Sequence, residues 1–212
     1  MDPRVIRTQK QLQIAFLELI AEKTYKDITV VDIVQRAGVE RKTFYRHYKS
    51  KNDLLLVWLE QVNEDIKTLA LFPPETAVAE AGQVGLHNSL AFCNYIHQHR
   101  ALFKSLFNGS ASAIVREQLR RTAAGVGMLL LQNSGLLANS GIPIDIVANI
   151  LAEAQVGAVV WWITTDSQHP PALLAELIIR IAEKGVFGLV NWPGTQFDVT
   201  KQPFNPQKYN LK

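Results

Sequence analysis

Apolar residues recur at three- and four-residue spacing along almost the whole chain. In residues 4–23, for example, the apolar positions form one face, while Arg7, Lys10 and Glu18 lie on the other. This is the period of an amphipathic α-helix, and from residue 75 onward no segment favours a β-strand. We therefore expect an all-α protein of about nine helices. The predicted helices span residues 4–23, 29–37, 40–47, 50–70, 75–98, 100–107, 111–133, 143–164 and 171–190.

Residues 28–54 carry the strongest local signals for helix ends. Thr29 followed by Asp32 is a capping box at the start of one short helix, and Ser50 followed by Asp53 predicts a second box. Gly38 stands where a left-handed residue would end the first of these helices. The pattern therefore predicts two short helices joined by a tight turn, then the start of a long helix.

The second short helix has a buried side and a basic side. Phe44 is its apolar residue. Two helices joined by a glycine-containing turn, the second one basic, are typical of a DNA-binding helix-turn-helix. A solvated helical hairpin is the alternative, and the coincidence of turn glycine, paired caps and basic face favours DNA binding. The exposed side presents Arg41, Lys42, Thr43, Tyr45, Arg46 and His47.

The same stretch resembles the DNA-binding domain of TetR/AcrR regulators over about residues 5–60. In that family a TFYRHY-like segment, here residues 43–48, is the recognition helix, and a K-x-x-L segment, here residues 51–54, opens the connecting helix. The wider pattern is similar to the dihydroxyacetone-kinase-regulator-like branch. Glu40 departs from the serine that often caps this helix. The resemblance implies a homodimer on a palindromic operator in double-stranded DNA. It places Tyr45, His47 and Lys51 at the DNA backbone, and Thr29 among the DNA-binding residues.

Charge is distributed unevenly along the chain. The net charge is +3, but residues 1–52 carry +5 and the remainder carries −2. That is the distribution expected of a DNA-binding part attached to a part with another role. Arg4 and Arg7 could reach a minor groove as an N-terminal arm, although a solvated basic start is favoured. Without an apolar signal segment, and with Cys93 as the single cysteine, the chain fits a cytoplasmic protein.

Domain boundaries follow from these patterns. We expect a helix-turn-helix domain at residues 1–50, a helical ligand-binding and dimerisation domain at 51–192, and an irregular tail at 193–212. The helix at 50–70 would connect the two domains. The helix predicted at 143–164 is apolar nearly all round from Ala152 to Ile163, which predicts that it is buried on several sides. A membrane span is the rival, but Asp145, Asn149, Glu153 and Gln155 argue against it.

The last two long helices are the predicted dimer interface. Their apolar surface exceeds what one small domain can hide, and large exposed apolar patches mark interfaces. Small residues in the first of them would let two helices approach closely. The predicted interface comprises Ala154, Gly157, Ala158, Trp161, Leu174, Leu177, Ile178 and Ile181.

The chain lacks the sequence signatures of common catalysts. We find no phosphate-binding glycine loop, no HExxH motif and no nucleophile elbow. His97 and His99 are two residues apart and would point in different directions on a helix. We therefore predict no catalytic residue, no metal site and no cofactor. A helical enzyme with an incidental basic hairpin is the weakest of the function hypotheses.

Polar and aromatic residues on otherwise apolar helices are the candidates for a small-molecule site. Core or interface packing is the alternative for each of them. We expect a ligand-responsive transcriptional regulator, acting as a repressor; the second hypothesis is a DNA-binding regulator without effector, whose second domain only dimerises or docks a partner. A well-formed closed cavity in this domain would favour the first hypothesis, and a solidly packed domain would favour the second. The candidates are Asn88, Tyr95, Phe103, Phe107, Arg116, Gln155, Trp161 and Trp162.

Overall fold

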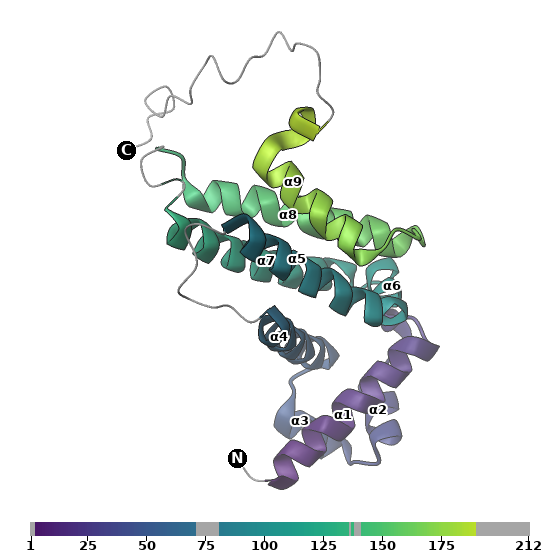
Figure 1. Ribbon diagram of the computed structural model, residues 1–212. Helices are drawn as coiled ribbons and strands as arrows, with labels where there is room; N and C mark the ends of the chain where they lie inside the picture. The colour runs from purple at the N-terminus through teal and green to yellow at the C-terminus, as the bar shows by residue number, and fades with distance from the viewer. Residues whose placement is uncertain (1–2, 71–80, 136, 138–140, 190–212) are drawn as a thin grey trace.

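The computed structural model describes residues 3–70, 81–135, 137 and 141–189 (Figure 1), and every regular element in these ranges is helical. The all-α prediction is confirmed. Residues 75–80, predicted to begin a helix, and the predicted tail at 193–212 lie outside the described ranges. The elements are α1 Pro3–Glu22, η1 Tyr25–Asp27, α2 Val30–Ala37, α3 Arg41–His47, α4 Lys51–Ala70, α5 Ala81–Gln98, α6 Arg100–Asn108, α7 Ser112–Ser134, α8 Ile144–Thr164 and α9 Pro171–Leu189.

Helices α1, α2 and α3, which we call the head, are set by local chemistry. The Asp32 amide donates to the Thr29 hydroxyl at 3.1 Å, and the Thr29 amide donates to the Asp32 carboxylate at 2.8 Å. This is the predicted capping box, and it fixes where α2 begins. Gly38 ends α2 with a φ of 66°, a conformation that glycine adopts without strain. The turn residue Val39 then donates its amide to the Val34 carbonyl at 3.0 Å.

Packing and charge hold the head together. Phe16, Ile33 and Phe44, one from each helix, are fully buried. Arg36 on α2 also binds Glu22 on α1 at 2.6 Å. Two short helices could not hide an apolar face alone, so α1 supplies the cover that α2 and α3 need.

The junction with α4 departs in detail from the sequence pattern. The segment between the first two predicted helices contains the short 3-10 turn η1. At the start of α4, the Asp53 amide donates to the Ser50 hydroxyl at 3.2 Å, as expected. The Asp53 carboxylate, however, accepts from the Lys49 amide at 2.8 Å. Of the two hydrogen bonds of the second predicted capping box, only the one from the Asp53 amide to the Ser50 hydroxyl forms. The Asp53 carboxylate accepts from the amide of Lys49 and not from that of Ser50.

Helices α5 to α9, which we call the body, form a bundle in which α7 packs along α8 and α5 along α9. Figure 1 shows α4 between this bundle and the head, and α1 extending up to α6. Trp162 on α8 is fully buried and donates its ring nitrogen to the His169 carbonyl at 2.9 Å. Arg100 on α6 donates to the Trp162 carbonyl at 3.1 Å, which fixes the end of α8 against α6.

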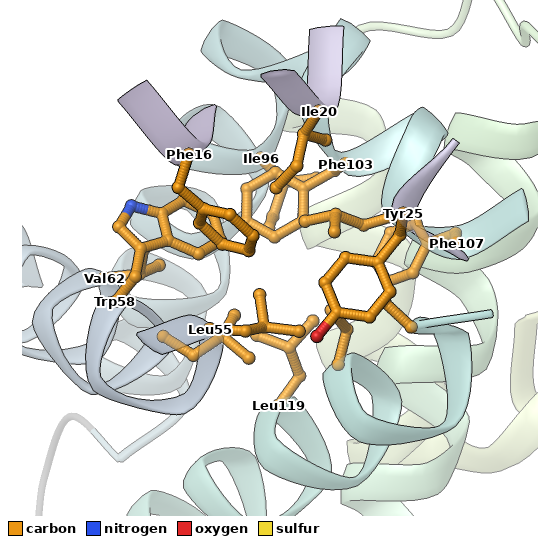
Figure 2. Close-up of a cluster of buried hydrophobic side chains, with 14 of the residues drawn as sticks. Phe16, Ile20, Tyr25, Leu55, Trp58, Val62, Ile96, Phe103, Phe107 and Leu119 are labelled. Carbon is orange, nitrogen blue, oxygen red and sulfur yellow. The ribbon is translucent and has the colours of Figure 1, made fainter. Parts of the chain in front are cut away.

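A continuous apolar cluster joins the head to the body (Figure 2). Phe16 on α1 and Tyr25 in η1 meet edge to face with ring centroids 6.1 Å apart. Trp58 on α4 and Phe103 on α6 lie 5.9 Å apart in the same cluster. All four side chains are buried. The head therefore rests on α4 and α6 through packed rings, so a shift of either helix would displace it.

Candidate nucleic-acid interface and body cavity

Helix α3 presents its polar side to solvent. Phe44 anchors the helix in the head core, while Arg41, Lys42, Tyr45 and Arg46 are exposed. The Arg41 guanidinium lies over the Tyr45 ring at 5.5 Å and its Nη2 donates to the Tyr45 hydroxyl at 3.4 Å. This contact orients Arg41 across the exposed surface of α3. Four of the residues predicted to bind DNA therefore share one accessible face.

The other predicted residues of the head differ in their exposure and contacts. Thr43 and His47 are half-buried, and the His47 Nε2 has no hydrogen-bond partner. The Thr29 hydroxyl is held within the α2 cap, where it accepts from the Asp32 amide and donates to the Asp32 carboxylate. Glu40 precedes α3 and makes no side-chain cap. Thr29 thus fixes the start of α2.

Lys51 differs from its predicted role at the DNA backbone. Its ammonium donates to the carbonyls of Tyr25 at 2.7 Å, Lys26 at 3.1 Å and Ile28 at 2.7 Å. Three donors thus meet three carbonyls, which leaves the ammonium no further donor for a phosphate. Burial lowers the pKa of Lys51, while Asp27 and Asp32 act to raise it. Lys51 ties η1 to α4 and positions the head.

Arg4 and Arg7 lie within the first turns of α1 and are exposed. An extended minor-groove arm would need these residues outside a helix. They are instead part of the basic exposed surface of the head.

The body contains a partly open cavity of about 230 Å³, lined by α5, α7, α8 and α9 and by the second half of α4. Asn88 on α5 and Gln155 on α8 line it, as predicted for a ligand site. The lining also includes Asn63, Ile66, Gly85, Ser89, Phe92, Leu119, Thr122, Ala123, Val126, Gly127, Leu130, Ala148, Leu151, Ala152, Ala154, Ala158, Ile178, Ile179, Ile181 and Ala182.

The remaining predicted ligand residues lie elsewhere, so these assignments were wrong for this cavity. Phe103 and Phe107 belong to the head–body cluster of Figure 2. Tyr95 is buried toward α4, and burial together with the Asp65 carboxylate raises its pKa to about 12. Arg116 is exposed and donates to the Ser112 hydroxyl. Tyr95, Phe103 and Phe107 pack in the core, which was the alternative stated from the sequence, whereas Arg116 faces solvent.

The two predicted tryptophans also lie outside the cavity. Trp162 is fully buried at the end of α8, whereas Trp161 is 54% exposed. Neighbours on an α-helix point about 100° apart, which explains the difference.

Asn63 and Ser89 line the cavity but were missed from the sequence. Asn63 is 7% exposed and Ser89 is 3% exposed. A signal was present, since Asn63 directly follows Val62 in the apolar stripe of α4, and a small polar residue within such a stripe is unusual.

Exposed apolar residues run along α8 and α9. On α8 the exposed positions include Ile146, Ile150 and Trp161, and on α9 they include Leu177 and Ile181. The small residues predicted for close helix approach, Ala154 and Gly157, are exposed on the same side of α8. Ala158 and Ile178 are half-buried and line the cavity. Leu174, also predicted for the interface, is 9% exposed and does not belong to this exposed stripe.

Helix α8 is long and apolar enough to cross a membrane by length and composition. Of its most apolar 18-residue window, 39% is buried within the body, and the helix packs on α7. A core helix passes the same test, so this is weak evidence for a membrane span. Within the described ranges, no cluster of His, Cys, Asp and Glu could hold a metal ion.

Two family models match the chain. Residues 15–57 match the model of bacterial regulatory proteins of the TetR family, and residues 87–184 match a transcriptional regulator C-terminal region. The first match covers α2, α3 and the start of α4, and the second covers most of the body.

Curated relatives resemble part of the chain. An uncharacterized HTH-type transcriptional regulator of Bacillus subtilis, YxbF, is 40% identical over 85 residues, or 38% of this chain and 22% of that protein. The dhaKLM operon transcriptional activator DhaS of Lactococcus lactis is 40% identical over 50 residues, or 24% of this chain and 27% of that protein. The matched segments thus span about a quarter of each relative's length.

Solved structures resemble the chain over most of its length. The fatty acid degradation regulator FadR of Bacillus halodurans has a TM-score of 0.66 at 14% identity, covering 88% of this chain and 97% of its own. FadR of Bacillus subtilis, solved in complex with stearoyl-CoA, has a TM-score of 0.61 at 17% identity, covering 84% and 98%. At these identities the likeness shows the fold.

Proposed function

This chain belongs to the TetR family of bacterial transcriptional regulators, and we propose that it acts as a homodimeric, ligand-responsive repressor. The exposed face of α3 is the observation that carries the proposal. Arg41, Lys42, Tyr45 and Arg46 stand on a helix whose other side is anchored by Phe44. A helix of this kind fits the major groove, with its N-terminal residues at base edges.

Within that arrangement the residues have different roles. Arg41 and Lys42 lie at the N-terminal end of α3, where an Arg can pair with a guanine edge. Tyr45 and His47 contact the DNA backbone, and Arg46 supplies a phosphate contact in place of Lys51. Because the head carries the basic excess of the chain, its field attracts DNA before any base is read.

The exposed apolar stripes of α8 and α9 support a dimer. Trp161, Leu177 and Ile181 are each more than a third exposed, which is unusual for large apolar side chains on a monomer. Two copies related by a twofold axis would bury both stripes. They would present two α3 helices to a palindromic operator with half-sites about 34–36 Å apart. Such a regulator acts in the cytoplasm, where its operator is.

The cavity supports an effector rather than a body that only dimerises. A solidly packed bundle would have favoured the effector-free alternative. Instead α4, which carries the head, also lines an apolar cavity through Asn63 and Ile66. A molecule bound there would contact the helix that positions the head. It would change operator affinity if it preferred one placement of α4.

Selection of bound sequences from random double-stranded DNA tests the proposal. We expect a palindromic consensus bound with a salt dependence of several phosphate contacts. Failure to enrich any sequence, with binding as weak as that to random DNA, would remove the repressor assignment. A reporter with the consensus at its promoter then tests the direction of control, and an activator would raise expression where we expect a fall.

A further inference from the structure

The body cavity combines an apolar wall with buried polar atoms that lack partners. The Asn63 Oδ1, both side-chain polar atoms of Asn88 and the Ser89 Oγ have no hydrogen-bond partner, and all three residues line the cavity. The Ser89 hydroxyl lies near the Cys93 thiol, where it partly opposes the effect of burial on the thiol's pKa. An unmade buried hydrogen bond is unfavourable, so these atoms favour a ligand that satisfies them.

These polar atoms come from one side of the cavity. Asn63 is on α4, and Asn88 and Ser89 are consecutive on α5, a helix that packs against α4. The lining from α7, α8 and α9 is largely aliphatic. Its polar members include Thr122, whose hydroxyl already donates to the Gln118 carbonyl at 3.1 Å. A ligand would therefore place a polar group against α4 and α5 and an apolar part against the other helices.

Charge is missing from the cavity wall. None of the residues that line it in the described part of the chain is Asp, Glu, Lys, Arg or His. A buried carboxylate or phosphate without a cationic partner is strongly unfavourable. The orphaned atoms include both a donor, the Asn88 amide nitrogen, and acceptors, the Asn63 and Asn88 oxygens. The complementary group is neutral and both donates and accepts hydrogen bonds, as an amide or a hydroxyl does.

From this arrangement we infer that the body binds an uncharged aliphatic molecule bearing one amide or hydroxyl group, held by Asn63, Asn88 and Ser89. The inference deepens the proposed effector function and rests on it for its regulatory meaning. It separates this cavity from a site for an acid or a coenzyme A thioester, both of which bring negative charge. The cavity of about 230 Å³ lies just below the usual range for ligand sites, about 300–1,000 Å³, and suits a small molecule.

Calorimetric titration of the full-length protein with decanamide, decanol, decanoate and lauroyl-CoA tests the ligand class. We expect decanamide or decanol to bind at least about tenfold more tightly than decanoate, since only the charged ligand must lose its hydration without a partner. Lauroyl-CoA should bind no better than decanoate. Tighter binding of decanoate or lauroyl-CoA, or no binding of either neutral ligand, overturns the inference. Whichever neutral ligand binds more tightly identifies the polar group.

The variant Asn88→Leu tests the polar contacts without opening a cavity. It replaces two unpartnered atoms by an apolar group of similar size, so the ligand-free protein should remain folded and melt no lower than the wild type. We expect the preference for decanamide over decanoate to fall by about tenfold. The control is Asn94→Leu, the same change on an exposed position of α5. An unchanged preference in Asn88→Leu, or an equal loss in Asn94→Leu, contradicts the assignment.

Operator binding separates this inference from the proposed function. If decanamide binds and leaves operator affinity unchanged, the ligand class stands and the effector role fails. If the neutral ligands fail while a palindromic operator is still bound, the ligand class fails and the DNA-binding function stands.

Discussion

Val62 and Asn63 are consecutive on α4 but face two different parts of the molecule. Val62 is fully buried in the head–body cluster of Figure 2, together with Phe16 and Trp58. Asn63 lines the body cavity. One turn of α4 thus contributes both to the head–body cluster and to the site proposed for the effector. Leu119 on α7 makes the same connection from the body, since it lines the cavity and belongs to the cluster.

This shared turn predicts coupling between ligand and operator. We expect a ligand that packs against Asn63 to shift α4. Because Val62 on α4 packs in the same cluster as Phe16, this shift would also move the head. A coupling free energy of about 1–3 kcal/mol changes operator affinity roughly 5- to 150-fold. Operator titrations with and without saturating ligand measure this factor. By linkage, operator DNA must weaken ligand binding by the same factor. An equilibrium effect of the ligand on operator affinity without the reverse effect would contradict the prediction.

Arg41 should determine sequence preference, and Arg46 should not. Loss of a bidentate Arg contact removes about 1–3 kcal/mol of discrimination at one base pair, so we expect Arg41→Ala to relax the consensus there. Arg46→Ala should weaken all sequences alike and reduce the salt slope by about one unit. Repeating the sequence selection and the salt titration with each variant checks both results. Equal loss on operator and random DNA in Arg41→Ala would refute its role.

Lys51 should act through the stability of the head. Its ammonium donates to three carbonyls around η1, at 2.7, 3.1 and 2.7 Å. Hydrogen bonds to a charged group each stabilise by about 1.5–3 kcal/mol, and the exposed part of the site reduces this. We expect Lys51→Ala to lower the free energy of unfolding by about 2 kcal/mol, measured by urea titration. The salt dependence of DNA binding should stay unchanged in this variant. A reduction of the salt slope by about one unit would instead show that Lys51 contacts a DNA phosphate.

The sequence predicted the elements that local chemistry determines. The Thr29–Asp32 box and the left-handed Gly38 are decided within a few residues, so the bounds of α2 follow from the sequence alone. The exposed face of α3 follows in the same way, because Phe44 fixes which side is buried. The position of each residue along its helix was therefore sufficient to predict most of the candidate DNA-binding surface.

The cavity and the role of Lys51 depend on contacts between distant segments. The Lys51 ammonium reaches carbonyls more than twenty residues earlier in the chain, and no local pattern shows those acceptors. Phe103 was predicted to line a ligand site because aromatic residues do so often. Phe103 is instead buried in the cluster where α6 packs against the head. Helical periodicity gives the buried face of a helix, but not which neighbour covers it.

Acid should weaken the head through Asp32. The Thr29 hydroxyl and the Lys23 ammonium hold the pKa of the Asp32 carboxyl well below its usual range. The folded pKa lies below the unfolded value of about 3.9, so this stabilisation is present above that pH. It is lost as the pH falls through the folded pKa. We expect Asp32→Asn to flatten the fall of melting temperature below about pH 4.

Melting curves between about pH 2 and pH 6 measure this effect. The control is Glu60→Gln, a change of the same kind at an exposed position of α4. It should keep the acid dependence of the wild type. An identical acid dependence in Asp32→Asn and the wild type would show that this carboxylate contributes nothing.

Gly157 and Gly125 form a matched pair for testing the dimer. Both are exposed helical glycines, Gly157 on α8 and Gly125 on α7, and a Cβ built on either meets no atom within 4 Å. Within one chain, therefore, either position has room for a side chain. Only Gly157 lies on the apolar stripe with Ile150 and Trp161, which are 62% and 54% exposed. A charge there would be buried without a partner when two copies meet.

We expect Gly157→Glu to be a folded monomer by light scattering at micromolar concentration, and Gly125→Glu to remain a dimer. The monomer should bind a palindromic operator far more weakly, because each half-site is then bound without the avidity of a linked second head. It should bind an isolated half-site as the wild type does, since α3 is unchanged. A dimeric Gly157→Glu would place the interface on another surface. Monomers from both variants would show that a charge on either helix disrupts assembly, and would remove the assignment to α8.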